Sequence, residues 1–298
     1  MTLYTQQNKN ITKTWLLISV FLVLVVALGY ALSYWLNSSI PLWIAVIYSI
    51  ISSFISYWYS DQIILTISRA KPASRKEYFD LYNIVENLSI TAGLPMPKIY
   101  IMNEKSPNAF ATGGDPKHAV ICVTSGLLDI LDKTELEGVI AHELSHIGNR
   151  DILLSSVIVV LVNIIALMSR WFSQSMFWGN GRDNNDNNGL GLLGLIFTLL
   201  AIIFIPIASM LTQLAISRKR EFLADASGVL LTRYPDGLIS ALEKIDNSNI
   251  PLRYVSNTTR SLFIADPYKK KSMSWFQKIW LTHPPVEDRI KALKSLNI

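Results

Sequence analysis

The chain has 298 residues, of which 50% are hydrophobic and only 16% are charged. That composition is too apolar for an ordinary soluble domain of this length and indicates membrane-spanning segments. The net charge of +5 needs no nucleic-acid partner, because the basic residues flank the apolar segments or cluster at 269–271.

The N-terminal part of the chain predicts two membrane spans. No charged residue occurs from position 14 to position 60, and this interval contains the apolar segments 15–36 and 40–59. Each has about 20 residues, enough to cross a hydrocarbon core of roughly 30 Å. The short link between them predicts a hairpin. A cleaved signal peptide is the alternative for the first segment, but its apolar run is long for that role and a second run follows at once.

Two short segments that are apolar and rich in β-branched residues, 98–102 and 119–124, predict strands after this hairpin. They flank the run Asn108–Ala111. The single cysteine, Cys122, lies in the second predicted strand. One cysteine excludes an internal disulfide and is consistent with a reducing compartment.

The five residues HELSH, which begin at His142, form the most informative motif in the chain. On a helix, residues four apart share a face, so His142 and His146 can present imidazole nitrogens to one zinc ion. Glu143 is then placed to act as general base toward a water and as proton donor to the leaving amine. Thr134 and Glu137 predict a capping box at the start of this helix.

Two further apolar segments, 152–171 and 190–216, follow the motif and predict a second membrane hairpin. The first contains only about 18 strongly apolar residues, so a buried helical hairpin within a core is the alternative. The loop that links them, 180–189, is rich in Asn and Gly, and its composition indicates no particular function.

The distribution of Lys and Arg predicts how these four spans are oriented. Cytoplasmic loops carry an excess of basic residues, and the opposite side offers only Arg182 and the borderline Arg170 at the end of the third predicted span. We therefore expect both termini and the HELSH helix in the cytosol. The basic residues that flank the cytosolic side are Lys9, Lys13, Arg69, Lys71, Arg75, Lys76, Arg218, Lys219 and Arg220.

A catalytic zinc site requires a third protein ligand, for which the downstream candidates are Glu221, Asp225, Glu243 and His283. A membrane hairpin leaves and re-enters one face of the bilayer, so it brings the residues at its two ends together. Glu221 lies just after the fourth predicted span, as His146 lies just before the third, and this topology favours Glu221. Asp225 is one helical turn further on, where it can accept the N–H of a liganding histidine. A solvated, charged helix start is the alternative for this segment.

Four groups of residues spread along the chain form a specific pattern. They are Asn108-Ala109-Phe110-Ala111-Thr112-Gly113, the HELSH motif with Asn149-Arg150-Asp151, Ser217 to Asp225, and Thr282-His283-Pro284-Pro285 with Asp288-Arg289-Ile290. With this pattern the chain resembles, over nearly its whole length, the HtpX-type membrane zinc endopeptidases, which are gluzincins and relatives of the CAAX prenyl proteases. The resemblance implies one zinc ion per chain, held by His142, His146 and Glu221, with Glu143 catalytic, in the bacterial inner membrane.

The resemblance also implies roles for other residues. The run Asn108–Ala111 would lie on an edge strand above the metal, where extended polypeptide can pair with the main chain; a plain sheet rim is the alternative. His283 would steady the oxyanion of the tetrahedral intermediate with a hydrogen bond. Asp225, Asn149 and Arg289 would surround the metal ligands.

The expected fold is an α-helical integral membrane protein with four transmembrane helices and a cytosolic α+β catalytic domain of the gluzincin type. The hairpins would divide the chain into 1–60, 61–151, 152–217 and 218–298. The expected function is zinc-dependent cleavage of misfolded or damaged membrane proteins at the cytosolic face, with the bilayer and polypeptide substrates as partners.

Three other functions were weighed against this one. A prenyl-protein endopeptidase uses the same metal chemistry, but such relatives tend to have more spans than four. A non-catalytic zinc-containing membrane adaptor is disfavoured because a structural site has no use for Glu143. A transporter is disfavoured because no predicted span carries an ionisable residue in its middle.

Overall fold

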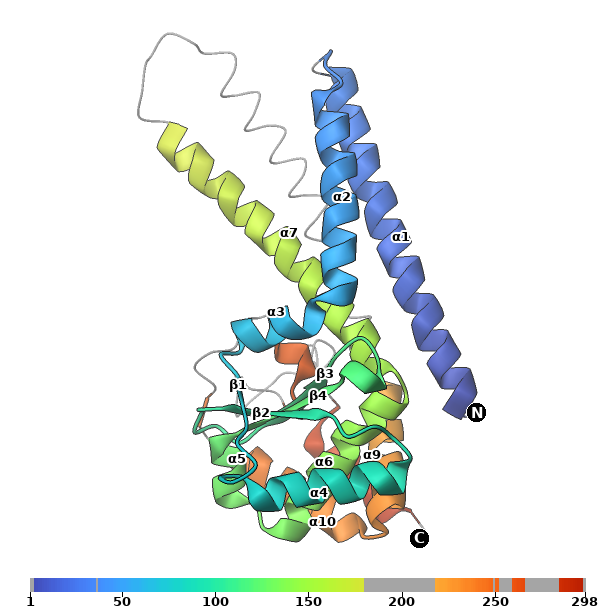
Figure 1. Ribbon diagram of the computed structural model, residues 1–298, viewed down its shortest axis with the longest axis vertical. Helices are drawn as coiled ribbons and strands as arrows, with labels where there is room; N and C mark the ends of the chain where they lie inside the picture. The colour runs from blue at the N-terminus through green and yellow to red at the C-terminus, as the bar shows by residue number, and fades with distance from the viewer. Residues whose placement is uncertain are drawn as a thin grey trace.

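The computed structural model shows three long helices that project from a body of one small sheet and shorter helices (Figure 1). The three are α1 (Leu3–Trp35), α2 (Ile40–Trp58) and α7 (Asp151–Gly179). The structure describes residues 3–35, 37–179, 218–248, 250–251, 259–265 and 284–296. The predicted fourth span, the loop 180–189 and His283 therefore lie outside the described residues.

Helices α1 and α2 form an antiparallel hairpin (Figure 1). Among the described residues, two helices are long and apolar enough to cross a membrane, the 28 residues Gln7–Tyr34 of α1 and the 19 residues of α2. They confirm the N-terminal pair of apolar spans. The helices touch closely at Gly29, where a Cβ atom would lie 2.3 Å from the Cβ of Ala45. Helix α1 starts at Leu3, well before the predicted span at residue 15. The polar residues that precede the span are therefore also helical.

Helix α7 follows the helix of the HELSH motif, α6 (Lys133–Gly148), after a sharp bend. The axes of the two helices differ by 82°, and the bend is made by Arg150, whose φ of 59° is in the left-handed region. Counted as one broken span, this pair would raise the number of candidate spans among the described residues from two to three. Apolar residues of α7, including Leu154 and Ile158, pack against Ile18 and Phe21 of α1.

The sheet confirms the two predicted strands. It contains β1 (Lys71–Pro72), β2 (Lys98–Met102), β3 (Ala109–Thr112) and β4 (Val120–Thr124) in the order β1-β2-β4-β3. Strands β2 and β4 are parallel, whereas β3 is antiparallel to β4. Strand β3 is thus an edge strand of the described sheet, and it carries three of the four residues of the run Asn108–Ala111.

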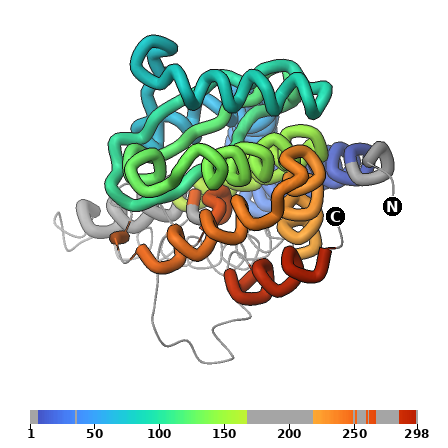
Figure 2. Tube along the Cα trace, turned by 90° about the horizontal axis from the view of Figure 1, so that it is seen from below, coloured from blue at the N-terminus to red at the C-terminus, as the bar shows by residue number. Residues whose placement is uncertain are grey.

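Helix α6 lies at the centre of the body. Figure 2 shows it between α4 on one side and the helices of the C-terminal half on the other. Buried apolar residues of these helices and of the sheet form one continuous core around it. The shorter helices are α3 (Ser60–Ile67), α4 (Phe79–Ala92), α5 (Ser125–Ile130), α9 (Arg218–Thr232), α10 (Pro235–Asn247) and α12 (Val286–Lys294), with 3-10 turns η1 (Pro116–His118) and η2 (Thr259–Leu262).

The capping box of α6 differs from the predicted one. Asp132 is the N-cap residue, and its Oδ1 accepts the amide of Glu135 at 2.9 Å, while Glu135 Oε2 accepts the amide of Asp132 at 2.8 Å. The prediction with Thr134 and Glu137 was wrong by two residues. An aspartate carboxylate caps a helix at least as well as a threonine hydroxyl, and the apolar stripe does not decide between two such starts.

Candidate metal centre

The two histidines of the motif face each other on one side of α6. Their Nε2 atoms are 3.2 Å apart, as expected for residues four apart on a helix. Glu221, near the start of α9, contributes the third group: its Oε1 lies 3.6 Å from Nε2 of His146 and its Oε2 lies 3.9 Å from Nε2 of His142. The three ligand atoms all lie within 4.8 Å of one another. The structure thus brings together the three residues that the sequence predicted as metal ligands.

A glycine of α9 allows this close approach. Gly228 packs against the backbone of α6, where a Cβ atom would lie only 2.9 Å from the amide nitrogen of His142. Real Cβ atoms essentially never come that near, so a larger residue would push α9 away from the ligand helix. Ala224, one turn earlier on the same helix, is fully buried and also small.

His142 is oriented by a buried ion pair. Its Nδ1 lies 2.9 Å from Oδ1 of Asp225, and Asp225 is held from its other side by Nε and Nη2 of Arg289 at 2.8 and 2.6 Å. Burial alone would raise the pKa of Asp225, but the charge and hydrogen bonds of Arg289 outweigh it and lower the pKa to about 2. Asp225 and Arg289 thus both lie where the sequence predicted them, beside a metal ligand.

His146 is oriented by a second carboxylate that the sequence analysis did not assign. Its Nδ1 lies 3.0 Å from Oδ2 of Asp151, the first residue of α7. Burial alone would lower the pKa of His146, but the Asp151 hydrogen bond and the neighbouring carboxylates outweigh it and raise the pKa to about 9. An acidic residue placed five positions after His146, at the start of an otherwise uncharged apolar segment, was the available signal.

The geometry of the two imidazoles fits a cation at their centre. When both imidazoles are neutral and donate Nδ1–H to an aspartate, each Nε2 presents a lone pair, and two lone pairs 3.2 Å apart repel unless a proton or metal ion lies between them. Ligand bonds of roughly 2.0–2.2 Å in a tetrahedral site place ligand atoms about 3.3–3.6 Å apart. The observed distances of 3.2–3.9 Å are close to this range. Two imidazoles and one carboxylate are a donor set that zinc accepts.

Glu143 lies beside these groups and is almost fully buried. Burial, followed by the charge of Glu221, raises the pKa of Glu143 to about 7, although the charges of His146 and Arg289 and the backbone amide of Ala111 act in the opposite direction. Together with the three candidate ligands it lines a pocket that is open to solvent. A carboxyl group with such a pKa can both accept and return a proton near neutral pH.

The outer edge of β3 is already paired at one end. Nδ2 of Asn108 donates to the carbonyl of Ala265 at 3.0 Å, and the amide of Ile264 donates to the carbonyl of Ala109 at 2.9 Å. The Phe110 ring packs edge-on against that of Phe263, with centroids 5.1 Å apart. The segment 263–265 therefore covers the Asn108–Ala109 half of the predicted substrate edge. Ala111, at the other half, lines the cavity.

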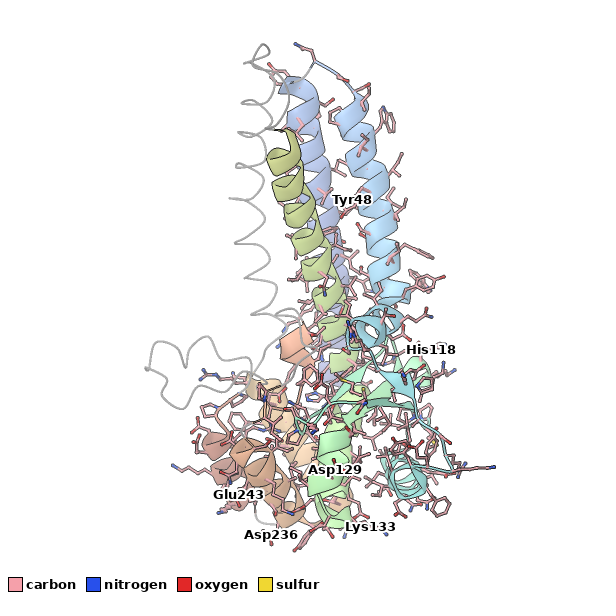
Figure 3. All side chains as sticks on the ribbon, turned by 90° about the vertical axis from the view of Figure 1, so that its left-hand side faces the viewer. Tyr48, His118, Asp129, Lys133, Asp236 and Glu243 are labelled. Atoms are coloured by element: carbon pink, nitrogen blue, oxygen red, sulfur yellow. The ribbon has the colours of Figure 1, made fainter. Side chains whose placement is uncertain are left out.

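Of three other predicted or weighed residues, two do not line the cavity and the third is not among the described residues. Asn149 is buried where α6 ends, and it is not among the residues that line the cavity. Glu243 is exposed on α10. It lies in the half of the body away from the long helices, on one of which Tyr48 is found (Figure 3). His283 lies outside the described residues, directly before Pro284, where the described chain resumes and leads into α12.

Known proteins match the chain over most of its length. Residues 75–297 match the model of Peptidase family M48. Relatives named Protease HtpX homolog are 46% identical in Caldanaerobacter subterraneus subsp. tengcongensis, covering 100% of this chain and 99% of the relative, and 43% identical in Streptococcus gordonii, covering 99% and 100%. The crystal structure of S. mikatae Ste24p is similar in fold, with a TM-score of 0.51 and 16% identity over 97% of this chain and 67% of that one.

Proposed function

The chain belongs to peptidase family M48 and is a membrane metalloprotease, and we propose that its active site is one zinc ion held by His142, His146 and Glu221. The observation that carries the proposal is the convergence of these three side chains in one cavity with Glu143 beside them. The reaction is hydrolysis of an internal peptide bond in a polypeptide substrate.

The chemistry divides between the ion and the side chains. A bound zinc ion supplies Lewis-acid chemistry: it polarises the scissile carbonyl and lowers the pKa of a water toward roughly 7. Glu143 takes the proton of the attacking water and then delivers it to the nitrogen of the leaving amine. Asp225 and Asp151 hold the Nδ1–H of His142 and His146, so that both Nε2 atoms stay aimed at one point.

The substrate backbone binds along the Ala111 half of β3. This half lines the cavity beside Glu143, whereas the Asn108–Ala109 half is paired with the segment 263–265. Main-chain pairing holds an extended polypeptide with little dependence on its sequence, which suits an enzyme that cleaves misfolded or damaged chains. We assign to His283 a hydrogen bond to the oxyanion of the tetrahedral intermediate.

The substrates that we propose are membrane proteins at the cytosolic face of the bacterial inner membrane. Support comes from Asp151, which contacts His146 and is also the first residue of the apolar helix α7. A centre attached so directly to an apolar helix meets cytosolic loops and dislodged segments of membrane proteins. We propose four spans from the four apolar segments, and cytosolic termini from the basic residues that flank those segments.

Replacement of the proposed base tests this function. We expect Glu143→Gln to keep its fold and zinc content and to lose casein cleavage by a factor of about 10² to 10⁴, the usual contribution of a general base. Glu137→Gln, a partly exposed carboxylate on the same helix, is the matched control and should cleave normally. Normal cleavage by Glu143→Gln would overturn the proposal.

A further inference from the structure

A buried amide of α1 reaches the metal centre from outside the peptidase body. The side chain of Asn10 is fully buried, and its Nδ2 donates to Oδ1 of Asp151 at 2.7 Å and to the carbonyl of Asn149 at 3.0 Å. Both partners are acceptors, so only the NH₂ of the amide can face them, and this fixes the orientation of the Asn10 side chain.

This amide completes a chain of contacts to a proposed metal ligand. Asp151 uses its two oxygens differently: Oδ1 faces Asn10, and Oδ2 accepts from Nδ1 of His146 at 3.0 Å. Nη1 of Arg220 lies farther from Oδ1, at 3.7 Å. Asn10 therefore holds the plane of the carboxylate in the position that leaves Oδ2 for His146.

The two histidines thus have parallel supports with different origins. His142 is held by Asp225, and Asp225 is held by Arg289 from α12, within the peptidase body. His146 is held by Asp151, and the amide that donates to Asp151 at 2.7 Å comes from α1, one arm of the N-terminal hairpin. The site thereby takes one of its supporting groups from a helix that is long and apolar enough to enter the membrane.

A second contact shows that α1 is fitted to the end of α6. Nε2 of Gln7 donates to the carbonyl of Gly148 at 2.6 Å, one turn away from Asn10 on the same helix. The last carbonyls of an α-helix have no partner within the helix, and here Gln7 and Asn10 supply donors to the carbonyls of Gly148 and Asn149. Only Asn10 also contacts Asp151, so the two residues can be separated experimentally.

We propose that Asn10 is a positioning residue for the metal centre, which acts through Asp151 to hold His146 and makes the N-terminal hairpin part of the active-site support. The proposal rests on the proposed role of His146 as a metal ligand. Groups that orient a metal-ligating histidine contribute about 10- to 100-fold to metal affinity or activity, and Asn10 is expected to fall within or just below that range because it acts one contact further away.

The experiment compares zinc affinity in full-length variants purified in detergent, by competition with a chromophoric chelator in the absence of substrate. Asn10→Asp keeps the shape of the side chain but replaces the donor with an acceptor facing Asp151, and it should weaken zinc binding about 10-fold. Asn10→Ala removes the amide without adding a charge and serves if the first variant does not fold. Gln7→Leu loses a contact to the same turn but none to Asp151, and it should bind zinc like the unaltered protein.

Activity provides a second measurement. Both Asn10 variants, when saturated with zinc, should lower kcat and leave KM nearly unchanged, because His146 is displaced while the β3 edge is intact. Unaltered zinc affinity and kcat in the Asn10 variants would overturn the inference, as would an equal loss of zinc in Gln7→Leu. Failure of the unaltered protein to bind zinc would instead overturn the proposed function, so the two failures are distinguishable.

Discussion

The N-terminal hairpin and the metal centre depart from ordinary protein interiors and surfaces in opposite ways. The hairpin leaves large apolar side chains exposed, as at Trp43 and Ile44, each 62% exposed. The metal centre buries charges, with Arg289 fully enclosed and Asp225 2% exposed. Exposed apolar surface and buried charge both cost free energy in water. Each region therefore depends on a partner other than water. Lipid serves the hairpin, whereas the buried charges of the centre pair with one another, as Arg289 does with Asp225 at 2.6 Å.

The two dependencies differ in kind. Lipid contact is spread over many equivalent side chains, so no single one of them decides whether the hairpin inserts. The centre depends on a few atoms that converge on one point, so we expect a single substitution there to have a large effect. Substitutions in the metal centre should therefore change stability and zinc affinity more than substitutions in the hairpin.

Arg289→Met should be the most damaging change to the fold. It removes the guanidinium that pairs with Asp225 at 2.6 Å and leaves that carboxylate buried without its partner, which typically costs about 3–5 kcal/mol. Chemical denaturation in detergent measures the loss. The double variant with Asp225→Asn should lose less than the sum of the two single changes, and additive losses would show that the pair does not act as a unit.

Gly228→Ala should come next. The added Cβ would lie 2.9 Å from the amide nitrogen of His142, so α9 must shift away from α6, at a cost of about 1–3 kcal/mol for overpacking. Because Glu221 moves with α9, the affinity for zinc should also fall. Ser227→Ala, at the preceding position, is the control; if both variants kept full stability and zinc affinity, the close approach of the two helices would have no importance.

The pH dependence of stability should identify a smaller contribution at the far end of α6. Burial alone would raise the pKa of Glu135, but its hydrogen bonds to Lys244, to Ser240 and to the amide of Asp132 outweigh it and lower the pKa. A carboxyl group with a lowered folded-state pKa stabilises the protein above its unfolded value and loses that contribution as the pH falls through the folded value.

The unaltered protein should therefore be more stable than Glu135→Gln. This difference in unfolding free energy should be largest near neutral pH and shrink below about pH 4.5. Unfolding curves at several pH values measure it. Zinc affinity at neutral pH should be unchanged, since Glu135 lies at the opposite end of the helix from His146. A difference that grew on acidification would contradict the assignment.

The smallest effect is expected in the hairpin. Ile44→Ala removes apolar surface that faces outward from α2, and exposed positions away from special features usually change stability by less than about 0.5 kcal/mol. Zinc affinity and casein cleavage should match those of the unaltered protein. A clear loss of zinc in this variant would show that α2 supports the centre specifically and would remove the contrast between the two regions.

Local patterns were enough to predict the main elements of the centre. The spacing of His142 and His146, and of Glu221 and Asp225, follows from helix geometry, whereas Glu221 was joined to the histidines through the predicted second hairpin. The structure places these four side chains together. The N-terminal hairpin and the strands β2 and β4 were likewise visible as apolar runs of the right length. Apart from the link between Glu221 and the histidines, the signal lay within a few neighbouring residues.

Contacts between distant segments were not predictable in the same way. Asp151 was taken as the boundary of a span, so its contact with His146 was missed, and Asn10 reaches it from 141 positions away. The pairing of Ile264 with β3 involves a short irregular segment that has no periodicity to read. Arg289 was placed by resemblance to a family, because no spacing rule connects it to Asp225.

The central claim is that His142, His146 and Glu221 hold one zinc ion. Metal analysis of the purified protein beside Glu221→Ala tests it most directly, with Glu243→Ala as an exposed control outside the centre. We expect one zinc ion per chain in the unaltered protein and in the control, and a loss of most of it in Glu221→Ala. The same zinc content in all three proteins would contradict the claim and place the third ligand elsewhere.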